Sequence, residues 1–379
     1  MLNFGCECQY CTASRNLRRI CTFEQNTIMR KLFIFTACIT IAFVACSKKS
    51  HLNPGGVNDP TTARLYFSGV FGDKGNVQGA CYWKNDSFTA LPGGAVNWAW
   101  AIATLGSDIY VAGSVDSAAA IWKNGVLTSL TDGLNFASAK AIAFSGQDVY
   151  VFGDGTSSGG HRIIWQWMNG QLTNLSPDSN TTFFGDAKVV NGSVYVTGYG
   201  FSSSANNLVA KLWVNGQETD LSDGSRGVST TGIFISGSDV YICGYETDPS
   251  NSHYIAMYWK NGQPVILSDS SGINIASSIT VSGGDVYVSG STQAGSLGQP
   301  TANNIGGYWK NGTFMKLTDG TADCNIDNLV IDGSELYVGY WAIGNGHPTY
   351  FKNGKSMELY LDPGLQAVGA VLSIFDPGN

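Results

Sequence analysis

Charged and ionisable side chains are scarce in this chain. Only 13% of its 379 residues are Asp, Glu, Lys or Arg, and it has four histidines. Acidic groups outnumber basic ones, which gives a formal net charge of −7. Residues 1–45 hold five of the 21 basic groups but only two of the 28 acidic ones, so the remainder carries −10. Because nucleic acid and anionic lipid both require a basic face, neither is an expected partner of the folded body.

Residue patterns that support catalysis are also missing. The chain has no Asp-box of the sialidase kind and no Gly-rich phosphate loop ahead of a helix. Its histidines are far apart in sequence: His51, His161, His253 and His347. We therefore expect no catalytic residue, no metal site and no cofactor. A polysaccharide hydrolase or lyase stays open as an alternative, because four acidic residues fall in predicted loops: Asp73, Asp154, Glu246 and Asp248.

Cysteine spacing gives no sign of a disulfide framework. Four of the nine cysteines lie in the first 28 residues and Cys38 lies in an apolar run. Beyond Cys46, only Cys81, Cys243 and Cys324 remain, each in a different repeat and without paired spacing. Cys81 and Cys243 fall inside strand patterns, so we expect them to be small buried hydrophobic residues.

The longest apolar run, from Leu32 to Ala45, is too short to span a bilayer, which takes roughly 18 residues. It follows Met29-Arg30-Lys31, and together these form the basic and apolar regions of a secretory signal over residues 29–45. A signal of this kind works at the true N-terminus. Residues 1–28 are therefore interpreted as a mis-annotated upstream extension, with translation starting at Met29.

The end of this run, Phe43-Val44-Ala45-Cys46, resembles the lipobox of bacterial lipoproteins, although that family usually has Leu where Phe43 stands. The resemblance implies cleavage before Cys46, lipidation of Cys46 and a protein tethered to the bacterial outer membrane or cell surface. An ordinary signal peptide or an anchor helix are the alternatives. Residues 46–62 are polar and contain Pro and Gly, which indicates a flexible tether.

Seven copies of one pattern fill the rest of the chain: Val/Ile-Tyr-Val-x-Gly, a variable gap, then Trp-Lys-Asn-Gly. The tyrosines are Tyr66, Tyr110, Tyr150, Tyr195, Tyr241, Tyr287 and Tyr337. The aromatic residues ahead of the turn are Trp83, Trp122, Trp167, Trp213, Trp259, Trp309 and Phe351. A repeat of 40 to 50 residues made of short β patterns predicts a propeller.

One repeat, residues 274–319, predicts a four-stranded antiparallel meander. Its third and fourth strands flank Asn311-Gly312, the strongest short signal for a two-residue hairpin turn. Such regular Tyr, Trp and Asn-Gly positions indicate structure rather than chemistry. The Asp that recurs after the fourth strand is interpreted the same way, as a cap of its own backbone.

The two ends of the repeat region are complementary. The first recognisable strand, Leu65 to Gly69, is a second-strand copy, and residues 367–375 form a first-strand pattern. We therefore predict an all-β, seven-bladed propeller over residues 63–379, whose ring is closed by the C-terminal strand joining the N-terminal blade. The Tyr-Trp-Lys-Asn-Gly repeat resembles bacterial extracellular propeller repeats of the HAF type, a motif without catalytic residues.

Loops between the second and third strands vary most, so we expect any binding site on the face where they open. Two groups of residues are candidates there. The first is an aromatic arc with a few polar groups: Phe71, Asp73, Lys74, Trp98, Trp100, Trp341 and His347. The second lies at the mouth of the central channel: Lys140, Asp186, Asp327 and Asn328. Packing under loops and inert ion pairs are the structural alternatives.

These features predict a non-catalytic envelope lipoprotein that binds a glycan or a protein through the variable-loop face. The expected partners are that ligand and, through the lipid anchor only, the membrane. A polysaccharide-cleaving enzyme and a purely structural envelope protein are the alternatives.

Overall fold

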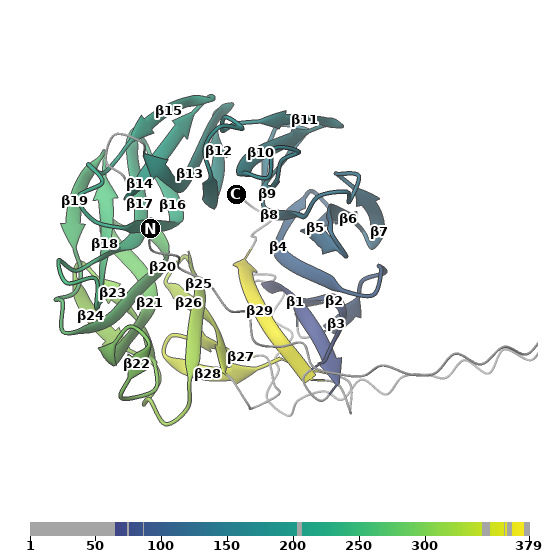
Figure 1. Ribbon diagram of the computed structural model, residues 1–379. Coiled ribbons are helices and arrows are strands. Elements are labelled where there is room, and N and C mark those ends of the chain that lie inside the picture. The colour runs from purple at the N-terminus through teal and green to yellow at the C-terminus, as the bar shows by residue number, and fades with distance from the viewer. Residues whose placement is uncertain are drawn as a thin grey trace, which may run out of the picture. The chain divides into compact units, whose positions relative to one another are not determined.

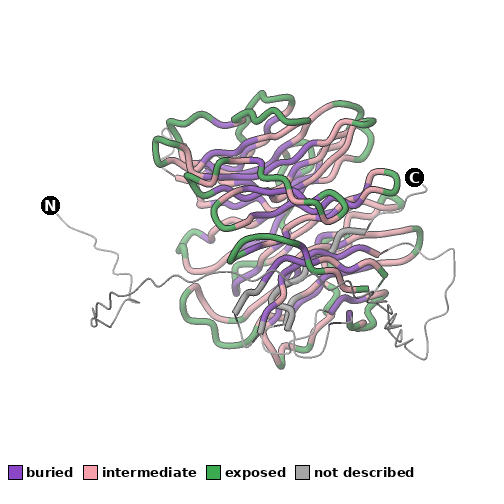
Figure 2. The backbone as a smooth tube through the Cα atoms, turned by 90° about the vertical axis from the view of Figure 1, so that its right-hand side faces the viewer, coloured by how far each residue is buried: buried purple, intermediate pink, exposed green. Residues whose placement is uncertain are grey.

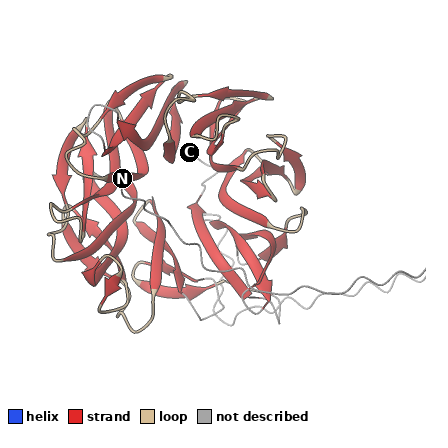
Figure 3. Ribbon diagram, in the orientation of Figure 1, coloured by secondary structure: helices blue, strands red, loops and turns tan. Residues whose placement is uncertain are grey.

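The computed structural model describes residues 65–73, 76–85, 87–202, 207–342, 349–359, 361 and 366–374. Within these ranges the side chains of residues 73, 76–78, 341–342 and 366–374 are not described. All described residues belong to a single compact unit. All regular elements in this part are β-strands (Figure 3), so it has no helix long and apolar enough to cross a membrane.

Five of the sheets have four antiparallel strands each. The first sheet comprises β29 (Gln366–Ile374), β1 (Leu65–Asp73), β2 (Asn76–Lys84) and β3 (Ser87–Ala90). The second comprises β4 (Asn97–Leu105), β5 (Asp108–Val115), β6 (Ala118–Lys123) and β7 (Val126–Ser129). The third comprises β8 (Ala137–Ser145), β9 (Asp148–Thr156), β10 (Arg162–Met168) and β11 (Gln171–Asn174). The fourth comprises β12 (Thr182–Val190), β13 (Ser193–Ser202), β14 (Asn207–Val214) and β15 (Gln217–Asp220). The last comprises β25 (Cys324–Asp332), β26 (Glu335–Ala342), β27 (Thr349–Lys352) and β28 (Lys355–Glu358).

The remaining strands form one nine-stranded sheet, so the prediction of seven separate four-stranded sheets is not confirmed. Its first part comprises β16 (Val228–Ser236), β17 (Asp239–Thr247), β18 (Tyr254–Lys260) and β19 (Gln263–Ile266). Its second part comprises β20 (Gly272–Ser282), β21 (Asp285–Ser296), β22 (Gln299–Pro300), β23 (Ile305–Lys310) and β24 (Thr313–Lys316). The physical reason is one parallel pairing, Tyr254 with Ile273, which joins β18 to β20. The short strand β22 lies in the long loop ahead of β23 and pairs antiparallel with the end of β21.

Successive sheets contact one another through their first strands, as in a propeller (Figure 1). Contacts run from β4 to β8, β12, β16, β20 and β25 in that order. Strand β29 pairs antiparallel with β1 over eight residue pairs, so the C-terminal strand belongs to the N-terminal sheet as the sequence predicts. Strand β29 also contacts both β4 and β25.

The repeat motif builds the packing between strands. Its Trp is almost fully buried in five copies, with Trp83, Trp122, Trp213, Trp259 and Trp309 each at most 2% exposed. The ring of Trp309 lies against the motif glycine Gly290, where an added Cβ would meet Cζ3 at 2.8 Å. The same Cβ would lie 2.0 Å from the carbonyl oxygen of Ile275 on the neighbouring strand. Glycine is therefore required where the first strand and the Trp both approach. Figure 2 shows the resulting pattern, with buried segments along the middle of the strands and exposed turns.

The Asn-Gly turns do more than reverse the chain. Asn311 and Gly312 both have positive φ, as a type I′ hairpin requires. The Oδ1 of Asn311 accepts a hydrogen bond from the backbone N–H of Val286 at 2.9 Å, and its Nδ2 donates to Asp285 at 2.8 Å. Asp285 also pairs with Lys310 at 2.8 Å. Equivalent bonds recur at Asn124, Asn261 and Asn353, so this end of the sheets is uniform and structural.

The third sheet departs from the pattern. Trp165, which is not one of the motif residues, is 2% exposed, whereas the motif residue Trp167 is only partly buried. Both side chains lie on the same side of β10, two residues apart. Trp165 occupies the place beside the motif glycine Gly153, where an added Cβ would meet its Cζ2 at 2.7 Å.

Two further structural expectations are confirmed, the second only in part. Cys81, Cys243 and Cys324 are buried, and none of them forms a disulfide bond. Of the six Asp residues that follow a fourth strand, four cap their own turn: Asp132, Asp223, Asp269 and Asp319 each accept the backbone N–H two residues on. Asp178 is described but makes no such bond. Asp362 lies outside the described residues.

Candidate functional site

The first strands of the sheets share a β-bulge. In six of them one residue has no partner on the second strand: Trp100, Lys140, Gly185, Thr231, Ser277 and Asp327. A bulge bends the strand and redirects the side chain of the extra residue. These positions line the inner edge of the sheets, close to the end at which the variable loops open.

Four of the bulge residues, from β4, β8, β12 and β16, lie around one cavity of about 560 Å³. Its size is in the range of sites for small ligands. Seven further residues complete the lining: Phe136, Ser138, Arg162, Phe184, Tyr199, Ser229 and Thr230. The wall therefore combines four aromatic rings, two cations and five hydroxyl groups, one of them the phenol of Tyr199.

Asp154 anchors the two cations of the cavity. Its side chain is 1% exposed, and it lies on β9 directly opposite Ser138. Lys140 Nζ lies 3.0 Å from Asp154 Oδ1, and Arg162 Nη2 lies 2.7 Å from Oδ2. A buried carboxylate needs such partners, because an isolated charge in the interior is very costly. The two cations remain about one-third exposed, at 32% and 29% of their side chains.

Aromatic rings hold this part of the cavity in place. The guanidinium carbon of Arg162 lies 5.6 Å from the centre of the Phe136 ring and 5.8 Å from that of Phe183. Phe183 in turn stacks on Tyr199 with ring centres 5.0 Å apart. Burial raises the pKa of Tyr199, so its hydroxyl stays protonated and can donate a hydrogen bond near neutral pH.

Several buried polar atoms of this lining have no hydrogen-bond partner among the described residues. They are Trp100 Nε1, Ser138 Oγ, Arg162 Nε and Thr230 Oγ1. Ser138 and Thr230 are each only 2% exposed. Buried donors and acceptors are nearly always paired in native proteins. Four such atoms around one cavity give it a capacity for polar recognition.

The predicted aromatic arc is only partly brought together. Trp98 and Trp100 lie in β4 rather than in a linker, with parallel rings 5.1 Å apart, and Trp100 lines the cavity. Phe71 instead packs edge-on against Phe88 within the first sheet. Lys74 and His347 lie outside the described residues. For Asp73 and Trp341, the ends of β1 and β26, only the backbone is described.

The predicted channel-mouth group does not form a single cluster. Lys140 lines the cavity, but Asp186 is engaged by Lys188 at 2.8 Å and accepts the backbone N–H of Ile233. Asn328 accepts a hydrogen bond from Ser278 at 2.9 Å. Burial raises the pKa of Asp327 to about 7.

Three of the four acidic residues considered for hydrolysis are held in structural contacts, and the side chain of the fourth, Asp73, is not described. Asp154 lies inside β9 and is buried, not in a loop. Glu246 pairs with Arg226. Hydrogen bonds from Ser250 and from the backbone of Ser252 and His253 lower the pKa of Asp248, the wrong direction for a general acid. Among the described residues, no three His, Cys, Asp or Glu side chains are grouped to hold a metal ion.

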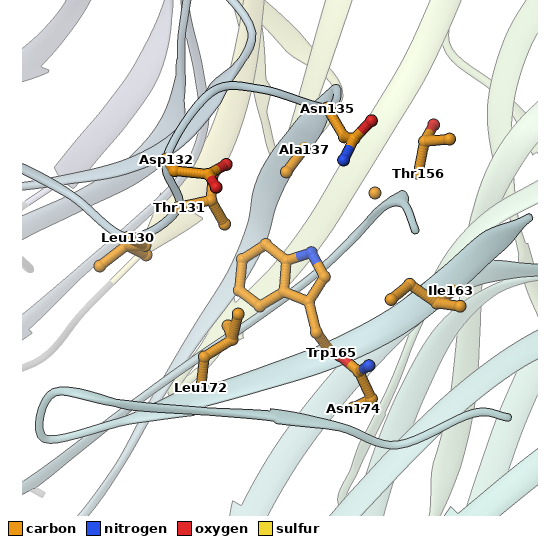
Figure 4. Close-up of a pocket in the computed structure, with 11 residues that line it drawn as sticks. Leu130, Thr131, Asp132, Asn135, Ala137, Thr156, Ile163, Trp165, Leu172 and Asn174 are labelled. Atoms are coloured by element: carbon orange, nitrogen blue, oxygen red, sulfur yellow. The ribbon is translucent and has the colours of Figure 1, made fainter. Parts of the chain in front are cut away.

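A second, smaller cavity of about 320 Å³ lies between the loop that follows β7 and the third sheet (Figure 4). The indole of Trp165 lies across it, with Leu130 and Leu172 nearby and Asn135 and Asp132 at the far side. Its wall has no charged group other than Asp132. It therefore offers fewer anchors for a polar ligand than the inner-strand cavity.

Comparison with known proteins supports the fold alone. No protein-family model matches the chain, and no curated protein sequence matches it. Solved structures do match, among them a Mycobacterium tuberculosis puromycin-hydrolyzing peptidase at 12% identity and a TM-score of 0.51, covering 78% of this chain and 53% of that one. A Pyrococcus horikoshii acylaminoacyl peptidase has 11% identity and a TM-score of 0.49, covering 80% of this chain and 53% of that one. The chain thus spans about half the length of these proteins. Together, sheet topology and similarity define the class: an all-β propeller with four-stranded antiparallel blades.

Sequence reasoning missed Arg162 and misplaced Asp154. The sequence does contain one signal that distinguishes Asp154 from the equivalent residues of the other repeats. Among the seven residues that follow the motif glycine, it is the only charged one, the others being Val70, Ser114, Tyr199, Tyr245, Ser291 and Tyr340. No repeat feature marks Arg162, which begins β10 after a variable loop.

Proposed function

We propose that this propeller is a binding module that takes part of a glycan into the cavity between β4, β8, β12 and β16. The observation that carries the proposal is the composition of that wall. Half-buried aromatic rings lie beside hydroxyl groups and buried polar atoms without protein partners. Such a wall suits a ligand that is apolar on one face and rich in hydroxyl groups at its edge.

A sugar ring has both properties. Its C–H face stacks on aromatic side chains such as Trp100 and Tyr199, and its hydroxyl groups donate to and accept from Ser138 and Thr230. Leaving buried polar groups unpaired costs about 1–3 kcal/mol each, so a ligand that pairs them gains that amount. Three of the four carboxylates considered for hydrolysis, Asp154, Glu246 and Asp248, are engaged by their neighbours, which supports binding over turnover.

A glycan array with the purified protein tests the proposal, using Trp100→Ala and Trp100→Phe alongside the wild type. Leu172→Ala, at the exposed edge of the other cavity, is the matched control. We expect saturable binding that Trp100→Ala weakens at least 10-fold, that Trp100→Phe partly retains and that Leu172→Ala leaves unchanged. Binding that Trp100→Ala does not alter, with folding verified by circular dichroism, would place the ligand elsewhere. Absence of binding to any glycan would refute the proposal.

We also propose that the nine-stranded sheet functions as two blades, which makes seven in all, and that β29 closes the ring. Support comes from the two antiparallel meanders within that sheet, which a single parallel pairing joins. The contacts of β29 with both β4 and β25 are consistent with closure. Deletion of residues 366–379 is then expected to unfold the protein rather than merely to shorten it.

The lipid anchor remains a proposal from the sequence, because Cys46 and residues 1–62 lie outside the described residues. It would present the module at the bacterial outer membrane or cell surface. Metabolic labelling with an alkyne fatty acid tests it, and Cys46→Ala should abolish both labelling and membrane retention.

A further inference from the structure

The inner-strand cavity has a charge opposite to that of the protein as a whole. Two cations, Lys140 and Arg162, share a single carboxylate, Asp154, so this cluster carries a net charge of +1. Asp186 on β12 pairs with its own cation, Lys188, and Glu246 on the neighbouring strand β17 pairs with Arg226. The chain as a whole carries −7. A positive cluster inside an acidic protein is therefore a local feature of this cavity.

Contacts with neighbouring side chains fix the positions of the two cations. Asp154 is buried and holds both, and Arg162 lies between the rings of Phe136 and Phe183. Arg162 Nε is buried, and no described residue accepts a hydrogen bond from it. Because 29% of the Arg162 side chain is exposed, the guanidinium donors that Asp154 does not use can engage the oxygens of a planar anionic group. The ammonium of Lys140 can approach the same group from the bulge of β8.

We infer that the glycan taken by this cavity is acidic, and that the carboxylate of a uronic acid residue binds between Lys140 and Arg162. This inference rests on the proposed function and adds the substrate class. The carboxylate would complete a balanced cluster of two cations and two anions. Its sugar ring would lie against Trp100 and Tyr199, and its hydroxyl groups would reach Ser138 and Thr230.

Calorimetric titration with paired ligands tests the inference. Each probe is a uronic acid trisaccharide, such as trigalacturonic acid, together with its carboxyl-reduced counterpart, which has the same linkages and no charge. We expect the acidic member to bind about 10- to 100-fold more tightly, the range that a charge-assisted hydrogen bond gives. Added salt should weaken binding of the acidic member only.

Variants of Lys140 locate the effect. Lys140→Gln should lower the ratio of the affinities for the acidic and reduced members at least 10-fold, whereas Lys140→Arg should leave this ratio unchanged. Lys140 is partly exposed, so both variants should fold, and near-ultraviolet circular dichroism verifies this. Loss of the preference in both variants would overturn the assigned role of charge at this position.

The outcomes separate this inference from the function on which it rests. Equal affinity for the acidic and reduced members would overturn the inference and leave the glycan-binding module standing. Binding of neither member, nor of any glycan on the array, would overturn both. Preference for peptides with a free C-terminal carboxylate over every uronate would also overturn the inference.

Discussion

The motif glycine Gly290 gives the sharpest test of how the repeat is built. A Cβ at this position would lie 2.0 Å from the carbonyl oxygen of Ile275 and 2.8 Å from Cζ3 of Trp309. The first contact is with backbone, about 1 Å closer than non-bonded atoms allow, so β20 and β21 must move apart at the bulge. Overpacking of this kind costs about 1–3 kcal/mol, and loss of ladder hydrogen bonds adds to it. We expect Gly290→Ala to lower the free energy of unfolding by about 3 kcal/mol.

Guanidinium unfolding followed by circular dichroism measures this change, and a Tm lower by about 5 °C should accompany it. Gly227→Ala is the matched control, because its added Cβ would find only ordinary contacts at 3.6 Å and its φ is not positive. That variant should stay within about 0.5 kcal/mol of the wild type. Equal stability of Gly290→Ala and the wild type would refute the claim that the bulge excludes side chains at the motif glycine.

Three further predictions follow from the same contacts. Asn311→Ala should lose about 2 kcal/mol of stability in chemical unfolding, because it gives up two hydrogen bonds and puts a Cβ at positive φ, whereas Asn311→Gly should lose about half as much. A raised carboxyl pKa means that the folded state binds the proton more tightly, so Asp327 should make stability fall as pH rises from about 4 to about 7. Asp327→Asn should remove that fall and be about 2 kcal/mol more stable than the wild type at pH 8 but not at pH 4, and parallel curves for the two proteins would contradict this. Arg162→Lys should bind acidic glycans more weakly in calorimetry even though it keeps the charge, because a single ammonium cannot present two parallel donors.

Much of the architecture was predictable because each repeat contains the turn and strand signals of its own sheet. The Asn-Gly turns fix two-residue hairpins through positive φ, and the structure shows this at Asn124, Asn311 and the other copies. The alternating pattern fixes which side of each strand is buried. Pairing of β29 with β1 followed from a missing first strand at one end and a spare one at the other.

The blade count was less secure, because sheet boundaries depend on contacts that the repeat does not encode. The pairing of Tyr254 with Ile273 arises where the chain enters β20, which begins earlier than the other first strands relative to its bulge. Replacement of Trp167 by Trp165 in the core has a similar cause. Either residue matches the alternation of β10, and only the space beside Gly153 decides between them.

The sequence prediction and the proposed site share only two residues, Trp100 and Lys140. Sequence placed Lys140 at the channel mouth and Trp100 in a separate arc, whereas the structure brings both to one cavity. The reason is the bulge, which shifts the side chains of the first strands by one position. In a strand without the bulge, Asp186 would stand at the position that Gly185 occupies here. Arg162 comes from a third strand, and its approach to Asp154 depends on the fold of a variable loop.

Hydrogen exchange measured by mass spectrometry, with and without the tightest-binding acidic glycan, tests the central claim most directly. We predict slower exchange confined to the segments that line the inner-strand cavity, residues 97–105, 137–145, 182–190 and 228–236. Segments of the smaller cavity, residues 130–135 and 171–174, should exchange as before. Protection at those residues, or uniform exchange throughout the protein at a saturating concentration of glycan, would contradict the assignment of the inner-strand cavity as the binding site.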